Sequence, residues 1–196
     1  MKQDIRHRRS IRLAEYDYCQ SNIYFVTICA VQRKCLFGDI QEGEARLSEA
    51  GKIVVEEWRK TEQLRSYVKT DEFVVMPNHF HGILGIVKEN EGTARRAPAI
   101  QEFGRPVAQS LPTIIGAFKS AAARSINLRQ STPGAQIWQR NFYEHVIRDE
   151  QSLNRIREYI INNPLSWELD RENPGRKGED GFYKWLASFK TLPKKP

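Results

Sequence analysis

Apolar residues recur along the chain with two different periods, and these periods predict where strands and helices lie. Residues 23–30 are rich in β-branched and aromatic side chains and predict a strand. Two more strands are predicted over 73–76 and 78–87, separated by a Pro-Asn break and close enough to form a hairpin. The segment 78–87 is apolar on both faces, which indicates a central strand. A shorter strand is predicted over about 142–147.

Three amphipathic segments predict helices, and a residue that favours the helix N-cap precedes each of them. The helices are expected over about 48–63, 111–129 and 150–162, next to Ser48, Ser110 and Asp149. Pro112 is tolerated in the first turn of the second helix. Pro164 ends the third helix, because the residue before a proline avoids the α region.

The order strand, helix, strand, strand, helix, strand predicts an α+β protein with a ferredoxin-like βαββαβ sandwich, followed by an added C-terminal helix. We expect one domain over 13–169, preceded by a basic arm over 1–12 and followed by a basic tail over 170–196. The segment 88–109 contains glycines, prolines and charges and predicts a long basic loop within the domain. An aromatic cluster in the tail is expected to dock back onto the domain.

The amino-acid composition leaves the predicted fold unchanged and bears on the binding partners and the cellular compartment of the protein. No apolar stretch approaches the roughly 18–20 residues that span a bilayer, so we expect no membrane association. The three cysteines include no CxxC pair, and the basic N-terminus has no apolar segment behind it, which together favour a cytoplasmic protein without a disulfide framework.

The formal net charge of +7 is unevenly distributed along the chain. Residues 1–12 carry a net +4, residues 88–140 a net +5 and residues 170–196 a net +3, whereas residues 13–87 and 141–169 carry −3 and −2. Basic segments around a slightly acidic core favour a surface that follows nucleic-acid phosphates. The simpler alternative is that the charged ends only aid solubility.

The residues most informative about chemistry are His79 and His81. Their spacing on a predicted strand places both imidazoles on one face, about 6.6 Å apart along the strand, where they can bind one metal ion. Two hydrogen-bonded histidines without a metal are the alternative, since such a short motif is weak evidence outside its structural context.

The third predicted helix supplies that context, because Tyr159 and Asn163 lie four residues apart on one helical face. A metal ion would polarise a phosphate oxygen, the Tyr159 hydroxyl would attack phosphorus, and the Asn163 amide oxygen would be a third metal ligand. Each residue alone has a structural explanation, as a packing tyrosine and a helix-ending asparagine. Tyr143 is the main rival nucleophile, and no Walker motif or GxGxxG sequence indicates nucleotide-driven chemistry.

Four stretches of the sequence together resemble the REP-associated tyrosine transposases: VVMPNHFHGIL, IIGAFKS, WQRNFYEHVIRDE and IREYIINNP. These proteins belong to the HUH single-strand transposases with one catalytic tyrosine, and the resemblance covers roughly residues 10–170. It implies a ferredoxin-like catalytic domain that uses Mg²⁺ or Mn²⁺ to cleave single-stranded DNA beside a hairpin. By match, His79 and His81 are the metal histidines, Tyr159 is the nucleophile, and Asn163 takes the position of the third ligand.

The resemblance also implies a partner, single-stranded DNA with a REP-like hairpin, and leaves open whether the protein acts as a monomer or a homodimer. Candidate DNA contacts are the arginines of the arm and the loop (Arg6, Arg8, Arg9, Arg12, Arg95, Arg96 and Arg105), Lys119 and Arg124 at phosphates, and Trp138, Gln139 and Arg140 at unpaired bases, on which they would stack or to which they would bind. For any one of these residues, an ordinary solvated side chain is the alternative.

Two other functions compete with a covalent DNA nickase and strand transferase. One is a non-catalytic nucleic-acid-binding module on the same fold, similar to an RRM or a domesticated regulator, although no RRM-type run of alternating aromatics occurs. The other is a phosphoesterase with two HxT motifs, which the isolated positions of His7 and His145 disfavour.

Overall fold

The structure is a computed structural model, and it describes residues 16–87 and 107–189. Its helices and strands are, in chain order, β1 (Asn22–Cys29), β2 (Gly38–Gln41), β3 (Glu44–Leu47), α1 (Glu49–Gln63), β4 (Val68–Met76), β5 (His79–Ile86), α2 (Leu111–Gln130), β6 (Tyr143–Ile147), α3 (Glu150–Asn162) and α4 (Gly181–Ser188). The result is a mixed α/β protein. Among the described residues, no helix is both long and apolar enough to cross a membrane.

The main sheet has four antiparallel strands in the order β4-β5-β1-β6. β5 is buried along almost its whole length, as its apolar sequence predicts, and β1 lies beside it at the centre. In the register of β1, Thr27 lies opposite His81 of β5 on one side and opposite Tyr143 of β6 on the other. Segments that are distant in sequence therefore meet around the middle of β1.

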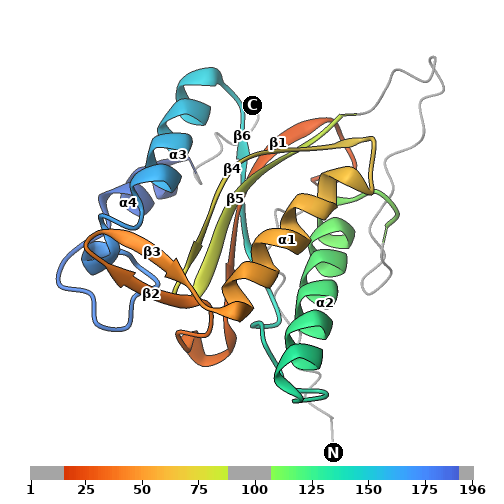
Figure 1. Ribbon diagram of the computed structural model, residues 1–196. Coiled ribbons are helices and arrows are strands. Elements are labelled where there is room, and N and C mark those ends of the chain that lie inside the picture. The colour runs from red at the N-terminus through yellow and green to blue at the C-terminus, as the bar shows by residue number, and fades with distance from the viewer. Residues whose placement is uncertain (1–15, 88–106, 190–196) are drawn as a thin grey trace, which may run out of the picture.

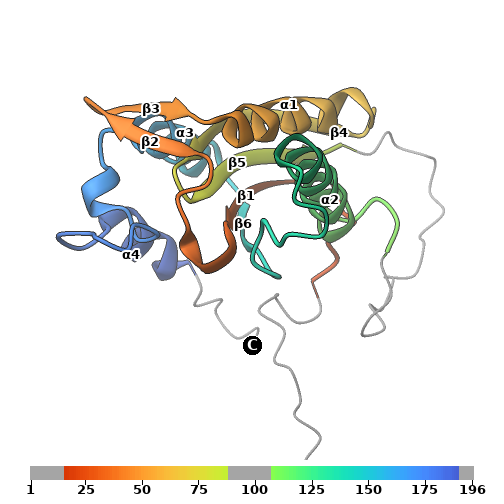
Figure 2. The same ribbon diagram turned by 60° about the horizontal axis from the view of Figure 1, so that its bottom comes forward.

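Helices cover both faces of this sheet (Figures 1 and 2). α1 and α2 cover one face, where Phe80 of β5 packs against Trp58 and Phe118 in the larger core. α3 and α4 cover the other face, where Ile83 of β5 packs with Ile156 and other residues of these helices in a smaller core. Because side chains alternate along a strand, the odd-numbered histidines of β5 lie on the α3 and α4 face.

The helix starts follow local chemistry at two of the three predicted caps. Ser48 Oγ accepts a hydrogen bond from Gly51 N at 3.2 Å, and Asp149 Oδ1 accepts one from Ser152 N at 2.7 Å. Ser110 occupies the N-cap position of α2, but its hydroxyl donates to the carbonyl of Val107 instead.

The structure also contains elements that the sequence pattern did not predict. β2 and β3 form a hairpin between β1 and α1, with Glu42 and Gly43 both at positive φ in its turn. β4 begins at Val68, well before the predicted 73–76 strand, and its register shifts between Thr70 and Phe73. Within the segment predicted as a tail, α4 packs onto the smaller core, which agrees with the expected docking of its aromatic cluster.

Candidate metal and tyrosine site

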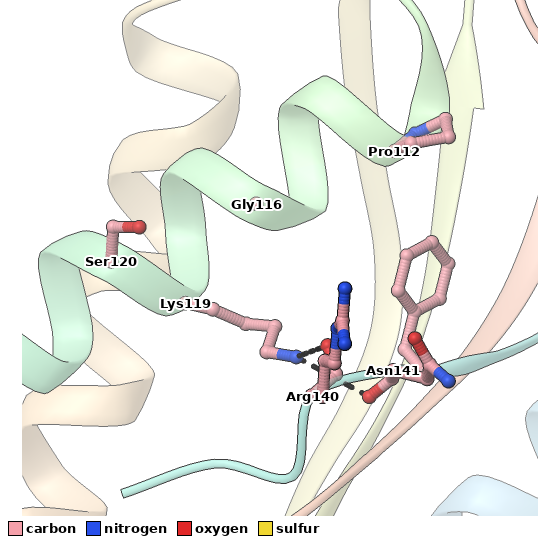
Figure 3. A pocket seen from close by; sticks show the side chains of 7 residues that line it. Pro112, Gly116, Lys119, Ser120, Arg140 and Asn141 are labelled. Atoms are coloured by element: carbon pink, nitrogen blue, oxygen red, sulfur yellow. Dashed lines mark hydrogen bonds between the residues drawn. The ribbon is translucent and has the colours of Figure 1, made fainter. Parts of the chain in front are cut away.

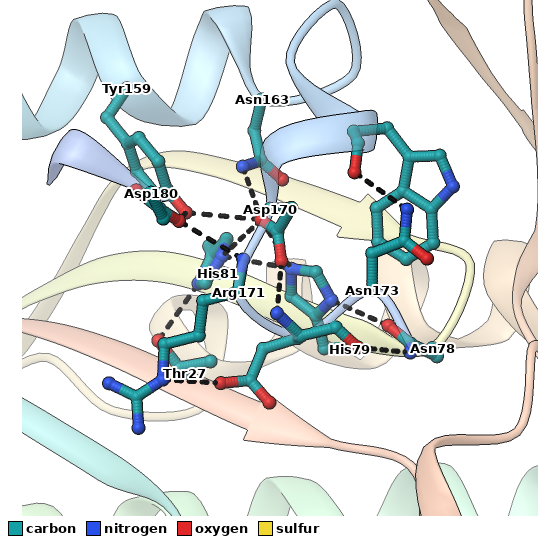
Figure 4. Close-up of polar contacts among 12 residues, drawn as sticks. Thr27, Asn78, His79, His81, Tyr159, Asn163, Asp170, Arg171, Asn173 and Asp180 are labelled. Atoms are coloured by element: carbon teal, nitrogen blue, oxygen red, sulfur yellow. Dashed lines mark hydrogen bonds and ion pairs between the residues drawn. The ribbon is translucent and has the colours of Figure 1, made fainter. Parts of the chain in front are cut away.

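His79 and His81 lie side by side on β5, under α3 and the segment that follows it (Figure 4). Both side chains are fully buried, and their Nε2 atoms are 2.9 Å apart. Burial, followed by the influence of His81, lowers the pKa of His79 to about 3, so this imidazole is neutral at physiological pH. A neutral imidazole is the form that binds metal ions.

The hydrogen bonds of Asn78 define which nitrogen of His79 faces the site. The Asn78 amide donates from Nδ2 to the carbonyl of Glu172 at 2.8 Å and to that of Arg33 at 3.3 Å. Its Oδ1 therefore accepts from His79 Nδ1 at 2.8 Å, and the Nδ1 proton leaves the lone pair on Nε2. This is the arrangement in which a second shell orients a metal-binding histidine.

Thr27 plays the corresponding part for His81. Its Oγ1 lies 2.9 Å from His81 Nδ1 and 3.0 Å from the Tyr183 hydroxyl. Two Nε2 lone pairs at 2.9 Å repel each other unless a proton or a cation lies between them. A cation would therefore require the His81 proton on Nδ1, where Thr27 Oγ1 can accept it.

A third candidate metal ligand is Asp170, which sequence reasoning missed. Its Oδ2 lies 3.7 Å from His79 Nε2 and 3.9 Å from His81 Nε2, and one ligand atom of each residue lies within 4.8 Å of the others. Burial opposes ionisation of Asp170, but its hydrogen bonds and the nearby imidazoles hold its pKa below the usual value. An ionised carboxylate and two neutral imidazoles form a group that can hold a divalent metal ion.

Asn163, the predicted third ligand, lies in the same group but contacts Asp170. Its Nδ2 donates to Asp170 Oδ2 at 2.7 Å, which orients the carboxylate. Its Oδ1 is buried and has no hydrogen-bond partner among the described residues. Such an orphaned oxygen is unusual, and a metal ion would supply the missing partner. The donor set therefore fits a divalent ion.

Tyr159 faces this group from α3 of the same chain. Its hydroxyl donates to Asp170 Oδ2 at 3.2 Å and Asp180 Oδ2 at 3.4 Å, and its ring centroid is 5.4 Å from that of His81. Phe182 stacks on the tyrosine ring at 3.6 Å and restricts its orientation. Burial and the neighbouring acidic groups raise the pKa of Tyr159, so the phenol keeps its proton in the absence of a cation.

The helix that carries Tyr159 is also held to the sheet. Arg157 of α3 forms a two-pronged ion pair with Asp71, which lies where the register of β4 shifts. This pairing fixes the rotation of α3 over the sheet.

The rival nucleophile, Tyr143, lies on β6, with its ring centroid 6.0 Å from that of Tyr183.

The structure places only some of the predicted DNA contacts. The seven arginines of the arm and the loop, Arg6, Arg8, Arg9, Arg12, Arg95, Arg96 and Arg105, lie outside the described residues. Arg124 and Arg140 are exposed, and Gln139 is partly buried. Trp138 is only 5 % exposed and packs against Phe37 and Phe118, so its indole belongs to the core and is not available for base stacking.

Lys119 lines a cavity of about 280 Å³ with Arg140 and Asn141 (Figure 3). Its ammonium group donates to the carbonyls of Gln139, Arg140 and Asn141 at 2.7, 3.0 and 3.3 Å. Burial lowers the pKa of Lys119 to about 8. The amine therefore ties the segment before β6 to α2, which differs from the phosphate contact expected from the sequence.

The Thr27 hydrogen bond leads to a testable expectation for metal binding. Thr27→Val keeps the side-chain shape but removes the acceptor for His81 Nδ1, so we expect Mn²⁺ affinity to fall about 10- to 100-fold. Isothermal titration of the full chain with Mn²⁺ measures this change. Thr70→Val is the matched control, because the Thr70 hydroxyl, on the edge strand β4, donates to the carboxylate of Glu62 in α1. Equal Mn²⁺ affinity in Thr27→Val and the control would show that Thr27 does not orient His81.

The fold and the site define a mixed α/β protein with a buried His-His-Asp group and a tyrosine beside it. The chain is 40 % identical over 172 residues to an uncharacterized protein of Haemophilus influenzae, and the match covers 85 % of this chain and 93 % of that protein. The chain belongs to the same family as that protein. No family model matches the sequence.

The resemblance to REP-associated tyrosine transposases is confirmed by two further comparisons. A second H. influenzae protein, provisionally named a REP-associated tyrosine transposase, is 29 % identical over 98 residues, which span 50 % of this chain and 49 % of that protein. A solved REP-associated tyrosine transposase bound to a REP hairpin superposes with a TM-score of 0.50 and 20 % identity, over 79 % of this chain and 74 % of that one. This structural likeness shows a shared fold.

Proposed function

We propose that this protein is a metal-dependent endonuclease and strand transferase that acts on single-stranded DNA at hairpins. The observation that carries the proposal is the position of Asp170, whose Oδ2 faces both histidines and also accepts the Tyr159 hydrogen bond. One carboxylate oxygen therefore joins the candidate metal group to the candidate nucleophile within one chain.

In this proposal His79, His81 and Asp170 bind a divalent ion, and the unpaired Asn163 Oδ1 lies in the same buried group. When bound, the ion would polarise an oxygen of the scissile phosphate and favour attack at phosphorus. The donor set of two imidazoles and a carboxylate suits Mn²⁺ on grounds of ligand softness, whereas Mg²⁺ prefers oxygen ligands.

The residues of this chain account for the proton as well as the nucleophile. Tyr159 Oη bonds to phosphorus, the bond from phosphorus to O3′ breaks, and the leaving oxygen takes a proton from water to become a free 3′-hydroxyl. Asp180 accepts the phenolic proton, because Asp170 is assigned to the metal and Asp180 is the other carboxylate at the Tyr159 hydroxyl. The DNA is held as a 5′-phosphotyrosine, and attack by another 3′-hydroxyl reverses the step without ATP.

Several finer features support this assignment. The antiparallel sheet has the order β4-β5-β1-β6, and α1 and α2, which follow β1 and β5 in the chain, lie on one of its faces. This arrangement agrees with a ferredoxin-like sandwich to which a tyrosine-bearing helix, α3, is added. The structural neighbour is described as bound to a REP hairpin, and we propose a similar hairpin DNA partner here. The basic arm, loop and tail are the proposed backbone contacts, with the solvent-exposed Arg124, and the exposed Arg140 is a proposed contact to unpaired bases.

The test is formation of a covalent protein–DNA adduct. The full chain is incubated with Mn²⁺ and oligonucleotides that join a hairpin to a single-stranded flank. We expect an adduct that survives denaturing electrophoresis in the wild type and disappears in Tyr159→Phe, since phenylalanine keeps the Phe182 stack but lacks the hydroxyl.

Tyr143→Phe is the matched control and should keep the adduct. An adduct that persists in Tyr159→Phe, or disappears only in Tyr143→Phe, would assign the nucleophile elsewhere. Salt-dependent DNA binding with no adduct in the presence of Mn²⁺ or Mg²⁺ would instead support the non-catalytic nucleic-acid-binding module.

A further inference from the structure

A cavity of about 190 Å³ lies beside the metal and tyrosine site, on the same face of the sheet. Its wall is formed by the ends of β1 and β6, the segment before β6, the residues after Asp170, and α4. The residues lining it are Thr27, Cys29, Arg33, Gln139, Asn141, Phe142, Tyr143, Arg171, Glu172 and Tyr183. The resemblance names Gln139 among the candidate DNA contacts, but neither the sequence pattern nor the comparisons assign a role to the cavity itself.

The cavity and the candidate metal group share one wall. Thr27 Oγ1 contacts His81 on the side of the metal group and Tyr183 on the side of the cavity. Glu172 lies two residues after Asp170 and donates its backbone N–H to Asp170 Oδ1 at 2.6 Å. A DNA strand with its phosphate at Tyr159 would therefore place an adjoining nucleotide at this cavity.

The charges around the cavity suit an anionic nucleotide. The Arg33 and Arg171 guanidinium groups pair with the Glu172 carboxylate at 2.9 and 3.2 Å, which leaves a net positive charge of one. Both arginine side chains are 45 % exposed, whereas that of Glu172 is 7 % exposed. The positive groups thus face the solvent, where a phosphodiester would approach, and the carboxylate fixes them from behind.

The remaining lining groups suit a nucleobase. The side-chain amides of Gln139 and Asn141 make no hydrogen bond among the described residues and can pair with a base edge. Tyr143 and Tyr183 supply aromatic surface, and the Arg171 guanidinium lies 4.5 Å from the centre of the Tyr183 ring. Bases stack on such planar groups in single-stranded nucleic-acid sites.

The wall that carries the two amides is held in place before any ligand arrives. Gln139 N donates to the carbonyl of Cys29 at 2.9 Å, and Ala30 pairs with Trp138 in an isolated bridge. From the other side, the half-buried Lys119 ammonium donates to the carbonyls of residues 139–141. Because this wall is already ordered, a ligand would bind with a smaller loss of conformational entropy.

We propose that this cavity binds one unpaired nucleobase of single-stranded DNA, with Gln139 and Asn141 at its edge and the arginines at its phosphate. The inference rests on the proposed function, because it places the base next to the cleaved phosphate. It adds a contact to the base itself, which the phosphate-tracking surface does not provide.

The test compares short single-stranded oligo(dA) with an abasic oligomer of the same length, by fluorescence anisotropy at one fixed salt concentration. Divalent ions are omitted, so the full-length protein binds without cleaving. We expect the wild type to bind oligo(dA) about ten-fold more tightly than the abasic oligomer, and this ratio to fall toward one when Gln139→Ala and Asn141→Ala are combined.

The matched control combines Gln63→Ala with Gln130→Ala, two exposed amides at the ends of α1 and α2, and should keep the wild-type ratio. A wild-type ratio near one, or an undiminished ratio in the cavity variant, would overturn the proposal.

Photocrosslinking of the wild-type protein tests the same site without relying on the folding of a variant. Oligo(dT) carrying 5-iododeoxyuridine should photocrosslink to peptides containing Tyr143 or Tyr183, and crosslinks found only elsewhere would also overturn it.

These outcomes separate the two proposals. Base-dependent binding at the cavity without a Tyr159 adduct would refute catalysis and keep the base site. A Tyr159 adduct with no base dependence at Gln139 and Asn141 would keep catalysis and refute the base site.

Discussion

Asp170→Asn is expected to lower the affinity of the protein for Mn²⁺ by about 100-fold or more and to abolish the covalent DNA adduct. The substitution keeps the shape of the side chain but removes the only negative charge among the proposed metal-binding residues. Second-shell changes alone cost metal sites about 10- to 100-fold in affinity, so the loss of a charged ligand should cost at least as much. Isothermal titration measures the affinity, and denaturing electrophoresis measures the adduct.

The control for this variant is Asp39→Asn, which removes one carboxylate from the exposed strand β2. It should bind Mn²⁺ like the wild type. Because Asn163, Glu172 and Tyr159 all donate to the Asp170 carboxylate, the thermal unfolding of Asp170→Asn should be recorded without metal to confirm that the variant is folded. A folded Asp170→Asn protein with unchanged Mn²⁺ affinity would remove Asp170 from the metal site.

The second large effect is expected at Asp180. Asp180→Asn should slow adduct formation about 100-fold or more, because an amide cannot take the phenolic proton of Tyr159. The Mn²⁺ affinity should stay unchanged, since Asp180 is not among the metal-binding residues. Asparagine is also a good N-cap, and so the start of α4, which Asp180 caps through Phe182 and Tyr183, should remain intact.

Single-turnover rates of adduct formation across a range of pH values test this assignment. In Asp180→Asn the rate should rise with pH, as hydroxide replaces the missing carboxylate. Asp149→Asn is a closely matched control, because Asp149 caps α3 in the same way and its cap is remote from the phenol. If Asp180→Asn reacts at the wild-type rate, the proton leaves Tyr159 by another route.

The parts of the site that could be predicted from sequence are those set by local geometry. A period of two residues places His79 and His81 on one face of β5, and a spacing of four places Tyr159 and Asn163 on one face of α3. The caps at Ser48 and Asp149 were equally local. These features depend on neighbours in the sequence, so the pattern of residues was sufficient.

The residues that were missed are positioned by tertiary contacts. Asp170 and Asp180 lie after Pro164, in a segment without helical or strand periodicity, and only its fold back over β5 brings them to Tyr159. Trp138 was misjudged for the same reason, because its pairing with Ala30 turns an indole that resembled a base contact into the core. The hairpin of β2 and β3 was too short to give a clear alternating pattern.

Tyr159 and Asp170 lie eleven residues apart on one continuous segment, whereas both histidines belong to the sheet. Any movement of α3 away from the sheet would remove the proposed nucleophile and the proposed charged ligand together. Under the proposed function, ion binding and helix docking would therefore be thermodynamically coupled, and each would strengthen the other by the same free energy. Tight metal binding would then indicate that the tyrosine is in place, whether the segment docks on its own sheet or on that of a second copy.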